Sequence, residues 1–197
     1  MTKTPTETPV LTVVDVKEWS AWLADQGTKA EGVWLVLAKK GTSHPTTLTY
    51  EEALEVAICH GWVDGQIAKG DERTFRRRFT PRRSGSLWSK RNVAIATRLI
   101  EEGRMHQTGL VAVEQAKKDG RWERAYAGPA TMEVPSDLAA ALEVIPSAKA
   151  MFESLNSANR YSVLYRVTTA KHLDTRQRRI KQFVTMLSHG DTIHPQR

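Results

Sequence analysis

The chain has 197 residues, of which 40% are hydrophobic and 26% are charged. A chain of this size can bury a core without disulfides or metals, so its composition argues against intrinsic disorder. Its apolar runs, such as Val33–Ala38, are far shorter than the roughly 20 residues of a membrane-spanning helix, which argues against a membrane span. Lys and Arg number 29 against 22 Asp and Glu, and the net charge of +7 favours a negatively charged partner.

The start of the chain and its cysteine content bear on location. The first ten residues are rich in Thr and Pro and lack the hydrophobic core of a signal peptide, so we expect a flexible lead-in over residues 1–12. The single cysteine, Cys59, cannot form an internal disulfide, which is typical of a reducing compartment. Both features favour the cytoplasm.

The first predicted helix begins after Asp15, which stands three residues before Glu18 in a capping pattern, and it ends at Gly27. Gly32–Lys39 is a compact apolar run with β-branched and aromatic residues, which predicts a buried strand. The Gly, Ser and Pro residues of segment 40–48 predict a loop.

A second helix is predicted between the capping box of Thr49 and Glu52 and the stop at Gly61. Two strand-like runs, Trp62–Ala68 and Thr74–Thr80, then flank a Gly-containing turn and predict a β-hairpin.

The second strand of this hairpin is unusually basic. Its alternation places Phe75, Arg77 and Phe79 on one face and Arg76 and Arg78 on the other. Pro81 would end the strand pairing because proline has no N–H to donate.

The rest of the chain is predicted to be helical, apart from a surface connection over residues 121–135. The expected helices are Leu87–Glu102, Thr108–Asp119, Ser136–Val144, Ser147–Leu155, Ser157–His172 and Thr175–Leu187, the last one capped by Asp174. With about three strands in the first half, the fold class is a helix-dominated α+β protein with a small antiparallel β element. We expect one globular domain over residues 13–190, with a strand-containing half 13–85, a helical half 86–190 and a tail at 191–197.

The sharpest candidate site is a basic stretch without an acid between Arg73 and Arg91. The segment Ser84–Ser86 lies within it, at a predicted helix start, where unpaired backbone N–H groups attract anions. Arginines at such a position oppose the helix dipole, and a bound anion would relieve that conflict. The predicted anion-binding groove consists of Arg78, Arg82, Arg83, Ser84, Ser86, Trp62, Trp88 and Asp64.

Two other interpretations of these residues stay open, and a second basic cluster lies elsewhere in the chain. The stretch can be a solvated basic loop whose arginines pair with Asp64, Asp71 and Glu72. Trp62 and Trp88 could stack on nucleic acid bases, since every base offers a π-face. A secondary basic patch on the last helix, usually a solvated surface, comprises Arg176, Arg178, Arg179 and Lys181.

No metal or cofactor site is expected from the sequence. Cys59, His60 and Asp64 stand close together, but sequence neighbours point in different directions, so a core role for Cys59 is favoured over catalysis. The remaining histidines have no metal-ligand spacing, and common nucleotide-binding and serine-nucleophile motifs are absent.

Eight segments in order resemble the bacterial YdeI/OmpD-associated family, also called OmdA or bacteriocin-protection proteins. They are Gly32–Lys40, Leu48–Ala53, Gly61–Gly65, Phe79–Arg83, Ser86–Asn92, Leu99–Met105, Ala116–Trp122 and Thr175–Ile180. The resemblance runs from about Trp19 to Leu187 and implies a role in resistance to bacteriocins and cationic antimicrobial peptides, with a link to an outer-membrane porin. The resemblance identifies no catalytic residue in this chain.

The leading hypothesis is therefore a non-enzymatic bacterial stress-resistance protein whose basic groove binds an anionic small molecule or nucleic acid. The first alternative is an enzyme that acts on a phosphorylated or carboxylated substrate in the same groove, with His60 or Asp64 as acid or base. The second alternative is a protein-interaction module whose helical half docks a protein partner. The oligomeric state stays open.

Overall fold

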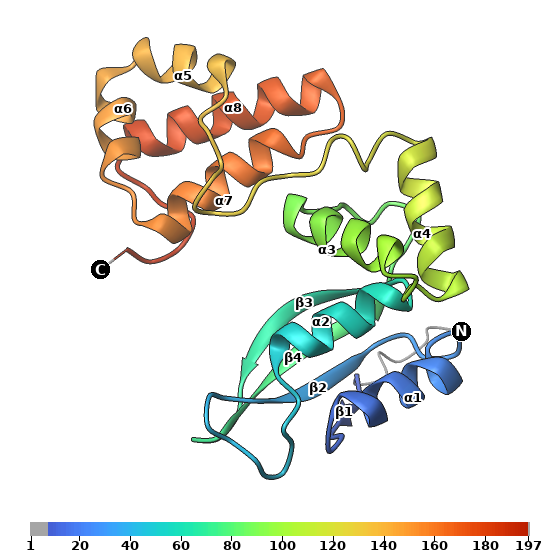
Figure 1. The fold of residues 1–197 in the computed structure, drawn as a ribbon. Helices are drawn as coiled ribbons and strands as arrows, with labels where there is room; N and C mark the ends of the chain where they lie inside the picture. Colours follow the sequence, from blue (N-terminus) through green and yellow to red (C-terminus); the bar gives the residue numbers. More distant parts are fainter. Residues whose placement is uncertain (1–7, 197) are drawn as a thin grey trace, which may run out of the picture. The chain divides into compact units, whose positions relative to one another are not determined.

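The computed structural model describes residues 8–196, and within them the chain forms eight helices and four strands (Figure 1). This confirms the helix-dominated α+β class. The chain divides into two compact units, unit 1 with residues 8–88 and 92–124 and unit 2 with Ser89–Arg91 and residues 125–196. Apart from Ser89–Arg91, the chain passes from unit 1 to unit 2 between residues 124 and 125, whereas the expected boundary between the strand-containing half and the helical half lies between residues 85 and 86.

Unit 1 is built on a four-stranded sheet with the strand order β1-β2-β4-β3. The predicted strands are confirmed as β2 (Val33–Ala38), β3 (Trp62–Lys69) and β4 (Thr74–Pro81), and β4 pairs antiparallel with both of the others. A fourth strand, β1 (Val10–Leu11), pairs parallel with β2.

Strand β1 corrects the expected lead-in over residues 1–12, because two of those residues belong to the sheet. The backbone pairing of Val10 with Trp34 fixes them there, a contact between distant segments that local composition does not reveal. The remainder of the expected lead-in, residues 1–7, lies outside the described residues.

Helices α1 (Val16–Gln26) and α2 (Tyr50–Cys59) pack on the same face of this sheet (Figure 1). Asp15 caps α1 by accepting hydrogen bonds from two backbone N–H groups, and Thr49 with Glu52 forms the predicted capping box of α2. The core between helices and sheet includes Trp19, Leu35, Ala53, Trp62 and Phe79.

Two further helices, α3 (Lys90–Glu101) and α4 (Gln107–Lys118), follow the hairpin. The predicted helix start at Leu87 is wrong, since α3 begins at Lys90. Residues 83–86 form a tight turn in which the Arg83 N–H donates to Ser86 Oγ at 2.9 Å and the Ser86 N–H donates to the Arg83 carbonyl at 2.9 Å. A serine side chain that bonds the local backbone competes with helix formation, which explains the later start.

Unit 2 contains α5 (Ser136–Glu143), α6 (Pro146–Glu153), α7 (Ser157–Thr168) and α8 (Leu173–Ser188), packed around an apolar core of their own. Helix α8 begins two residues before the predicted Thr175, so Asp174 lies in its first turn and is not its cap.

The segment expected to be a tail is bound to α7. The His194 N–H donates to Asn159 Oδ1 at 2.9 Å, and Asn159 Nδ2 donates to the His194 carbonyl at 3.1 Å. Asn159 is 1% exposed, so these bonds satisfy a buried amide that would otherwise carry a desolvation cost.

Candidate functional site: a basic pocket beside helix α4

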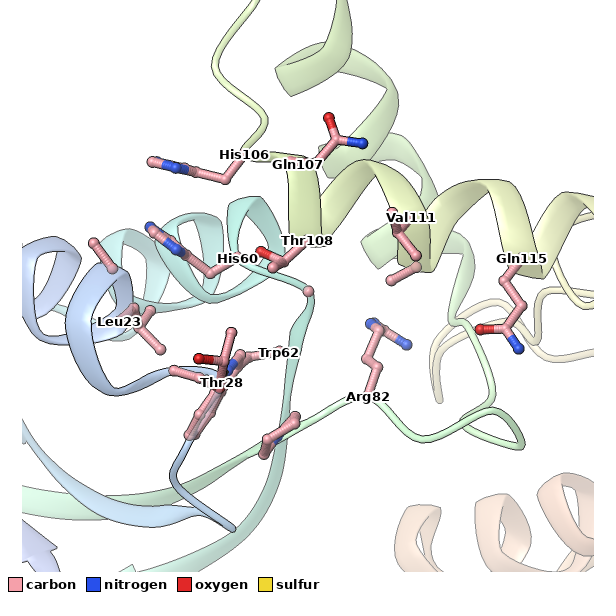
Figure 2. A pocket seen from close by; sticks show the side chains of 15 residues that line it. Leu23, Thr28, His60, Trp62, Arg82, His106, Gln107, Thr108, Val111 and Gln115 are labelled. Atoms are coloured by element: carbon pink, nitrogen blue, oxygen red, sulfur yellow. The ribbon is translucent and has the colours of Figure 1, made fainter.

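A pocket of unit 1 with a volume of about 500 Å³ lies among the end of α1, the α2–β3 junction, the end of β4 and the start of α4 (Figure 2). Its polar lining includes Thr28, His60, Arg82, His106, Thr108 and Gln115, and none of its described lining residues is Asp or Glu. The pocket therefore offers one fixed positive charge and several hydrogen-bonding groups without a competing carboxylate.

Two glycines allow α4 to approach the pocket floor closely. A Cβ on Gly109 would lie 2.2 Å from the Cys59 carbonyl oxygen, and a Cβ on Gly61, whose φ is +76°, would lie 2.8 Å from the Thr108 carbonyl oxygen. The His106 N–H also donates to the Cys59 carbonyl at 3.1 Å. The first turn of α4 is thus held against the α2–β3 junction by backbone contacts that any side chain at these glycines would disrupt.

The start of α4 is electrostatically uncompensated. His106 stands at the N-cap position without a side-chain cap hydrogen bond, and the first turn contains no acidic residue. The first N–H groups of a helix have no partner within the helix and carry a partial positive charge. Thr108, in this turn, lines the pocket, so the positive end of the helix contributes to it.

Arg82 supplies a full positive charge to the pocket, in addition to the partial charge of the helix end. Its side chain extends from the end of β4 toward α4 (Figure 2). The guanidinium carbon lies 3.5 Å from the centroid of the Trp88 ring, and Nη1 donates to the Leu87 carbonyl at 3.1 Å. Trp88 is 1% exposed and makes an edge contact with Trp122 at 4.9 Å, so Arg82 rests on a rigid aromatic surface.

A pair of histidines forms the other side of the pocket. The rings of His60 and His106 stack with their centroids 3.8 Å apart. Burial, reinforced by the neighbouring His106, lowers the pKa of His60 from 6.5 to about 4. His60 is 7% exposed and its Nε2 has no hydrogen-bond partner among the described residues. This imidazole is therefore neutral at pH 7 and leaves a polar atom unsatisfied.

The structure separates the eight residues of the predicted groove. It brings Arg82 and Trp62 into the pocket and places Trp88 under Arg82. Trp62 is buried and its Nε1 donates to the Gly27 carbonyl at 3.0 Å, so little of its ring is left to form the expected apolar wall.

Asp64 lies outside the pocket, on the helix-covered side of the sheet. It accepts hydrogen bonds from Arg77 Nε at 3.1 Å and from the Tyr50 hydroxyl at 2.9 Å, and it forms an ion pair with Arg77. The interpretation of Asp64 as an arginine partner within the hairpin is thus the one that the geometry supports.

The other four groove residues also lie away from the pocket. Arg78 lies on the strand face opposite to that of Arg77, as the alternation predicts. Arg83 and Ser84 are exposed in the turn before α3, and the Ser86 hydroxyl is engaged by the Arg83 N–H. No helix begins at Ser84–Ser86, so the reason for placing an anion there does not hold.

The secondary basic patch belongs to unit 2, and its four residues differ in whether their charges are engaged by other groups. Arg176 donates to both carboxylate oxygens of Asp137, at 2.6 and 2.8 Å, and its charge is therefore largely compensated. Arg179 donates to the Arg166 carbonyl, whereas Arg178 and Lys181 are exposed.

Sequence reasoning missed Thr28, His106 and Thr108, three residues that the fold brings into the pocket. The position of His106 just before a helix without a side-chain cap is the signal that could have identified it. Burial raises the pKa of the Cys59 thiol, in keeping with a core role for that residue.

Residues 8–196 contain no group of three His, Cys, Asp or Glu residues placed to hold a metal ion. None of their helices combines the length and apolar character needed to cross a membrane.

Fold and pocket together define a helix-dominated α+β protein with a basic pocket in its strand-containing unit. Comparison with known families places it further: the chain belongs to the family described as "Domain of unknown function (DUF8412)", whose model matches residues 11–112. This range contains nearly all of the pocket. A second family model, "Bacteriocin-protection, YdeI or OmpD-Associated" (OmdA), matches residues 131–190, which lie in unit 2.

The resemblance to the YdeI/OmpD-associated family is thereby confirmed as a relationship through residues 131–190. Of the eight segments that suggested it, only Thr175–Ile180 falls within that match, and six fall within the range of the other family. No curated protein and no solved structure matches the chain significantly.

Proposed function

We propose that this is a non-enzymatic bacterial stress-resistance protein that binds a small phosphate- or carboxylate-bearing molecule in the pocket around Arg82. One observation carries the proposal: an arginine and an uncapped helix start line the same pocket, whose described lining residues include no carboxylate. Both features favour the binding of a negatively charged group in the pocket. Arginine can bind a carboxylate or phosphate through two parallel hydrogen bonds.

The stress-resistance part rests on the match of residues 131–190 to the bacteriocin-protection family. A small anionic ligand fits this setting better than direct capture of cationic peptides, because the net charge of +7 would repel them. We therefore place the protein in a regulatory or stress-response role in the cytoplasm, with the bound anion as its signal or cargo.

The geometry removes one of the two acid–base candidates of the enzyme alternative. That alternative needs His60 or Asp64 to meet a substrate beside the arginines. Asp64 is engaged by Arg77 and Tyr50 away from the pocket, whereas His60 lines the same pocket as Arg82 although it is only 7% exposed. The interaction-module alternative has no specific support, since the exposed large apolar residues of unit 2 within the described chain are Val144 and Leu173.

The proposal is tested by thermal-shift and calorimetric titration of the full chain with inorganic phosphate, nucleoside monophosphates and citrate. A ligand at 100 times its dissociation constant stabilises a protein by about 2.7 kcal/mol, which is readily seen as a raised melting temperature. We expect at least one of these anions to bind, with an affinity that Arg82→Ala abolishes and Arg82→Lys partly retains, because lysine keeps the charge but not the planar fork.

Arg83→Ala is the matched control, since it removes the same charge from the adjacent, exposed position. It should leave the affinity unchanged. Equal losses in the Arg82 and Arg83 variants would show diffuse electrostatic attraction and overturn the pocket assignment, as would the absence of binding to every anion in the panel.

A further inference from the structure

The sheet of unit 1 has two unlike faces. Helices α1 and α2 cover one of them with a dense apolar core (Figure 1). The second face is less covered, because Trp34, Arg76 and Arg78 are partly exposed there, whereas Leu35 and Leu37 on the helix-covered face are fully buried. What occupies the second face therefore depends on the side chains that the strands present there.

Strand register identifies those side chains. Side chains directly opposite each other in an antiparallel pair share a face, and Arg77 opposite Leu35 belongs to the covered one. On the second face Trp34 stands opposite Arg78, and Val36 stands opposite Arg76.

This face also has an apolar edge and open space. Val10 pairs with Trp34 from β1 and is 55% exposed. On the other side of Arg78 the neighbouring strand has Gly65, where a Cβ would meet only Arg78 atoms, at 3.6 and 3.9 Å. Trp34, Arg76 and Arg78 are all partly exposed. The result is a tryptophan with two arginines at its side on a partly exposed face of the sheet, on which Val36 is 9% exposed.

The two arginines lack carboxylate partners within the described chain. Arg76 Nη2 donates to the Lys69 carbonyl at 3.2 Å, and Arg78 Nε is buried without a hydrogen-bond partner. The acidic residue of the hairpin, Asp64, pairs with Arg77 on the covered face. The second face thus carries two arginines without a carboxylate partner, and the buried Nε of Arg78 is unsatisfied.

From this arrangement we propose that the second face of the sheet, formed by Trp34, Val36, Arg76 and Arg78, binds single-stranded nucleic acid. Trp34 would stack on a base, and the two arginines would contact the flanking phosphates. This surface is distinct from the pocket of the proposed function, which lies at the end of α1 and beside α4.

A single strand fits this face better than a duplex. Bases in a duplex are stacked on each other and hide their π-faces, whereas the bases of a single strand can be spread over an aromatic side chain on a sheet. A flat sheet face also lacks the protruding helix or ribbon that enters a major groove. The chemistry therefore selects unpaired RNA or DNA, with little dependence on sequence because every base can stack.

The test is fluorescence anisotropy of a labelled oligo(dT) of about 12 nucleotides, a length within the range of about 4 to 16 that single-strand sites cover. Base–aromatic stacking contributes about 1–3 kcal/mol per base, so Trp34→Ala should weaken binding about 5- to 150-fold and Trp34→Phe should retain most of the affinity. Each phosphate contact contributes about 0.7 to the slope of log K against log salt for single strands, so Arg76→Gln/Arg78→Gln should lower that slope by about 1.4.

The matched control is Arg178→Gln/Lys181→Gln, which changes the net charge equally at two exposed positions of α8. It should leave both affinity and slope nearly unchanged, as should Arg82→Ala, which separates this surface from the pocket. Circular dichroism and melting temperature verify the fold of each variant. Equal losses in the α8 control, equal affinity for a duplex of the same length, or no binding by the wild-type chain would each overturn the proposal.

Discussion

The guanidinium of Arg82 lies 3.5 Å from the ring centroid of Trp88, and this contact determines where the charge of the pocket points. The arginine could otherwise extend into solvent from the end of β4. Because Trp88 is 1% exposed and packs edge-on against Trp122, the core of unit 1 fixes the position of an arginine that lines the pocket.

Trp88→Phe is therefore expected to weaken anion binding without removing any group that touches the anion. A cation–π contact contributes about 0.5–1 kcal/mol at a partly exposed site and is strongest with tryptophan, so we expect a loss of about 2- to 5-fold in affinity. Calorimetric titration with the most tightly bound anion of the panel measures this loss of affinity. Trp22→Phe, a change in the aromatic cluster around Trp19, should lower stability yet leave the affinity intact; an affinity loss there would point to a general loosening of unit 1.

His60 should make the stability of the protein fall in mildly acidic solution. Its pKa is lower in the folded chain, at about 4, than the ordinary value of 6.5, so the unfolded chain takes up a proton first as the pH decreases. The stabilisation from keeping His60 neutral is complete above pH 6.5 and is lost as the pH falls toward 4. Urea denaturation should show a loss of about 2 kcal/mol between pH 7 and pH 5.

His60→Gln should flatten this dependence, because an amide does not titrate in that range. His106→Gln provides the control, since His106 is exposed in the same stacked pair. An unchanged pH dependence in His60→Gln would show that other groups cause the loss.

Asp64→Asn should clearly destabilise the protein. The side chains of Arg77 and Asp64 are only 18% and 13% exposed, so removing the carboxylate leaves a guanidinium largely buried without its partner charge. Breaking a fully buried pair costs about 3–5 kcal/mol, and the residual exposure reduces the expected loss here to about 2 kcal/mol. Asp25→Asn removes a solvent-exposed pair with Lys29 and should leave the free energy of unfolding nearly unchanged.

Gly109→Ala should disturb the pocket from below. Its Cβ would lie 2.2 Å from the Cys59 carbonyl oxygen, so α4 must move away from the α2–β3 junction. Overpacking of this kind costs about 1–3 kcal/mol, and anion affinity should fall as well because Thr108 moves with the helix. Gly85→Ala is the control, because its Cβ meets no atom within 4 Å, and it should leave both stability and affinity unchanged. Full anion affinity in the Gly109 variant would show that the position of α4 does not affect binding.

Local sequence patterns predicted several elements correctly. The capping residues Asp15 and Thr49 set the starts of α1 and α2, and the alternation in β4 placed Arg77 and Arg78 on opposite faces. These features depend on groups a few residues apart, which bond in the same way in any context. The start of α3 was placed too early, because the turn of residues 83–86 bonds locally in a manner that competes with a helix.

The candidate site was predicted only in part. Arg82, Trp62 and Trp88 lie in or beside the pocket, whereas the prediction of Arg83, Ser84 and Ser86 depended on a helix start at Ser84–Ser86 that the structure does not have. The pocket instead takes Thr28, His106 and Thr108 from segments far away along the chain. Their convergence depends on how closely α4 packs on the end of α2, which only the folded backbone specifies.

By itself, the sequence determined the class of the fold, the hairpin, most of the helices and the concentration of arginine in β4 and after it. Those properties follow from composition, capping and hydrophobic periodicity, which act over a few residues. Only the tertiary structure decided that Asp64 belongs to Arg77, that Arg82 rests on Trp88 beside α4, and that Trp34 lies opposite Arg78 on the second face of the sheet. Each of these pairs is joined by strand register or helix packing, and such long-range geometry is fixed by the burial of the whole core.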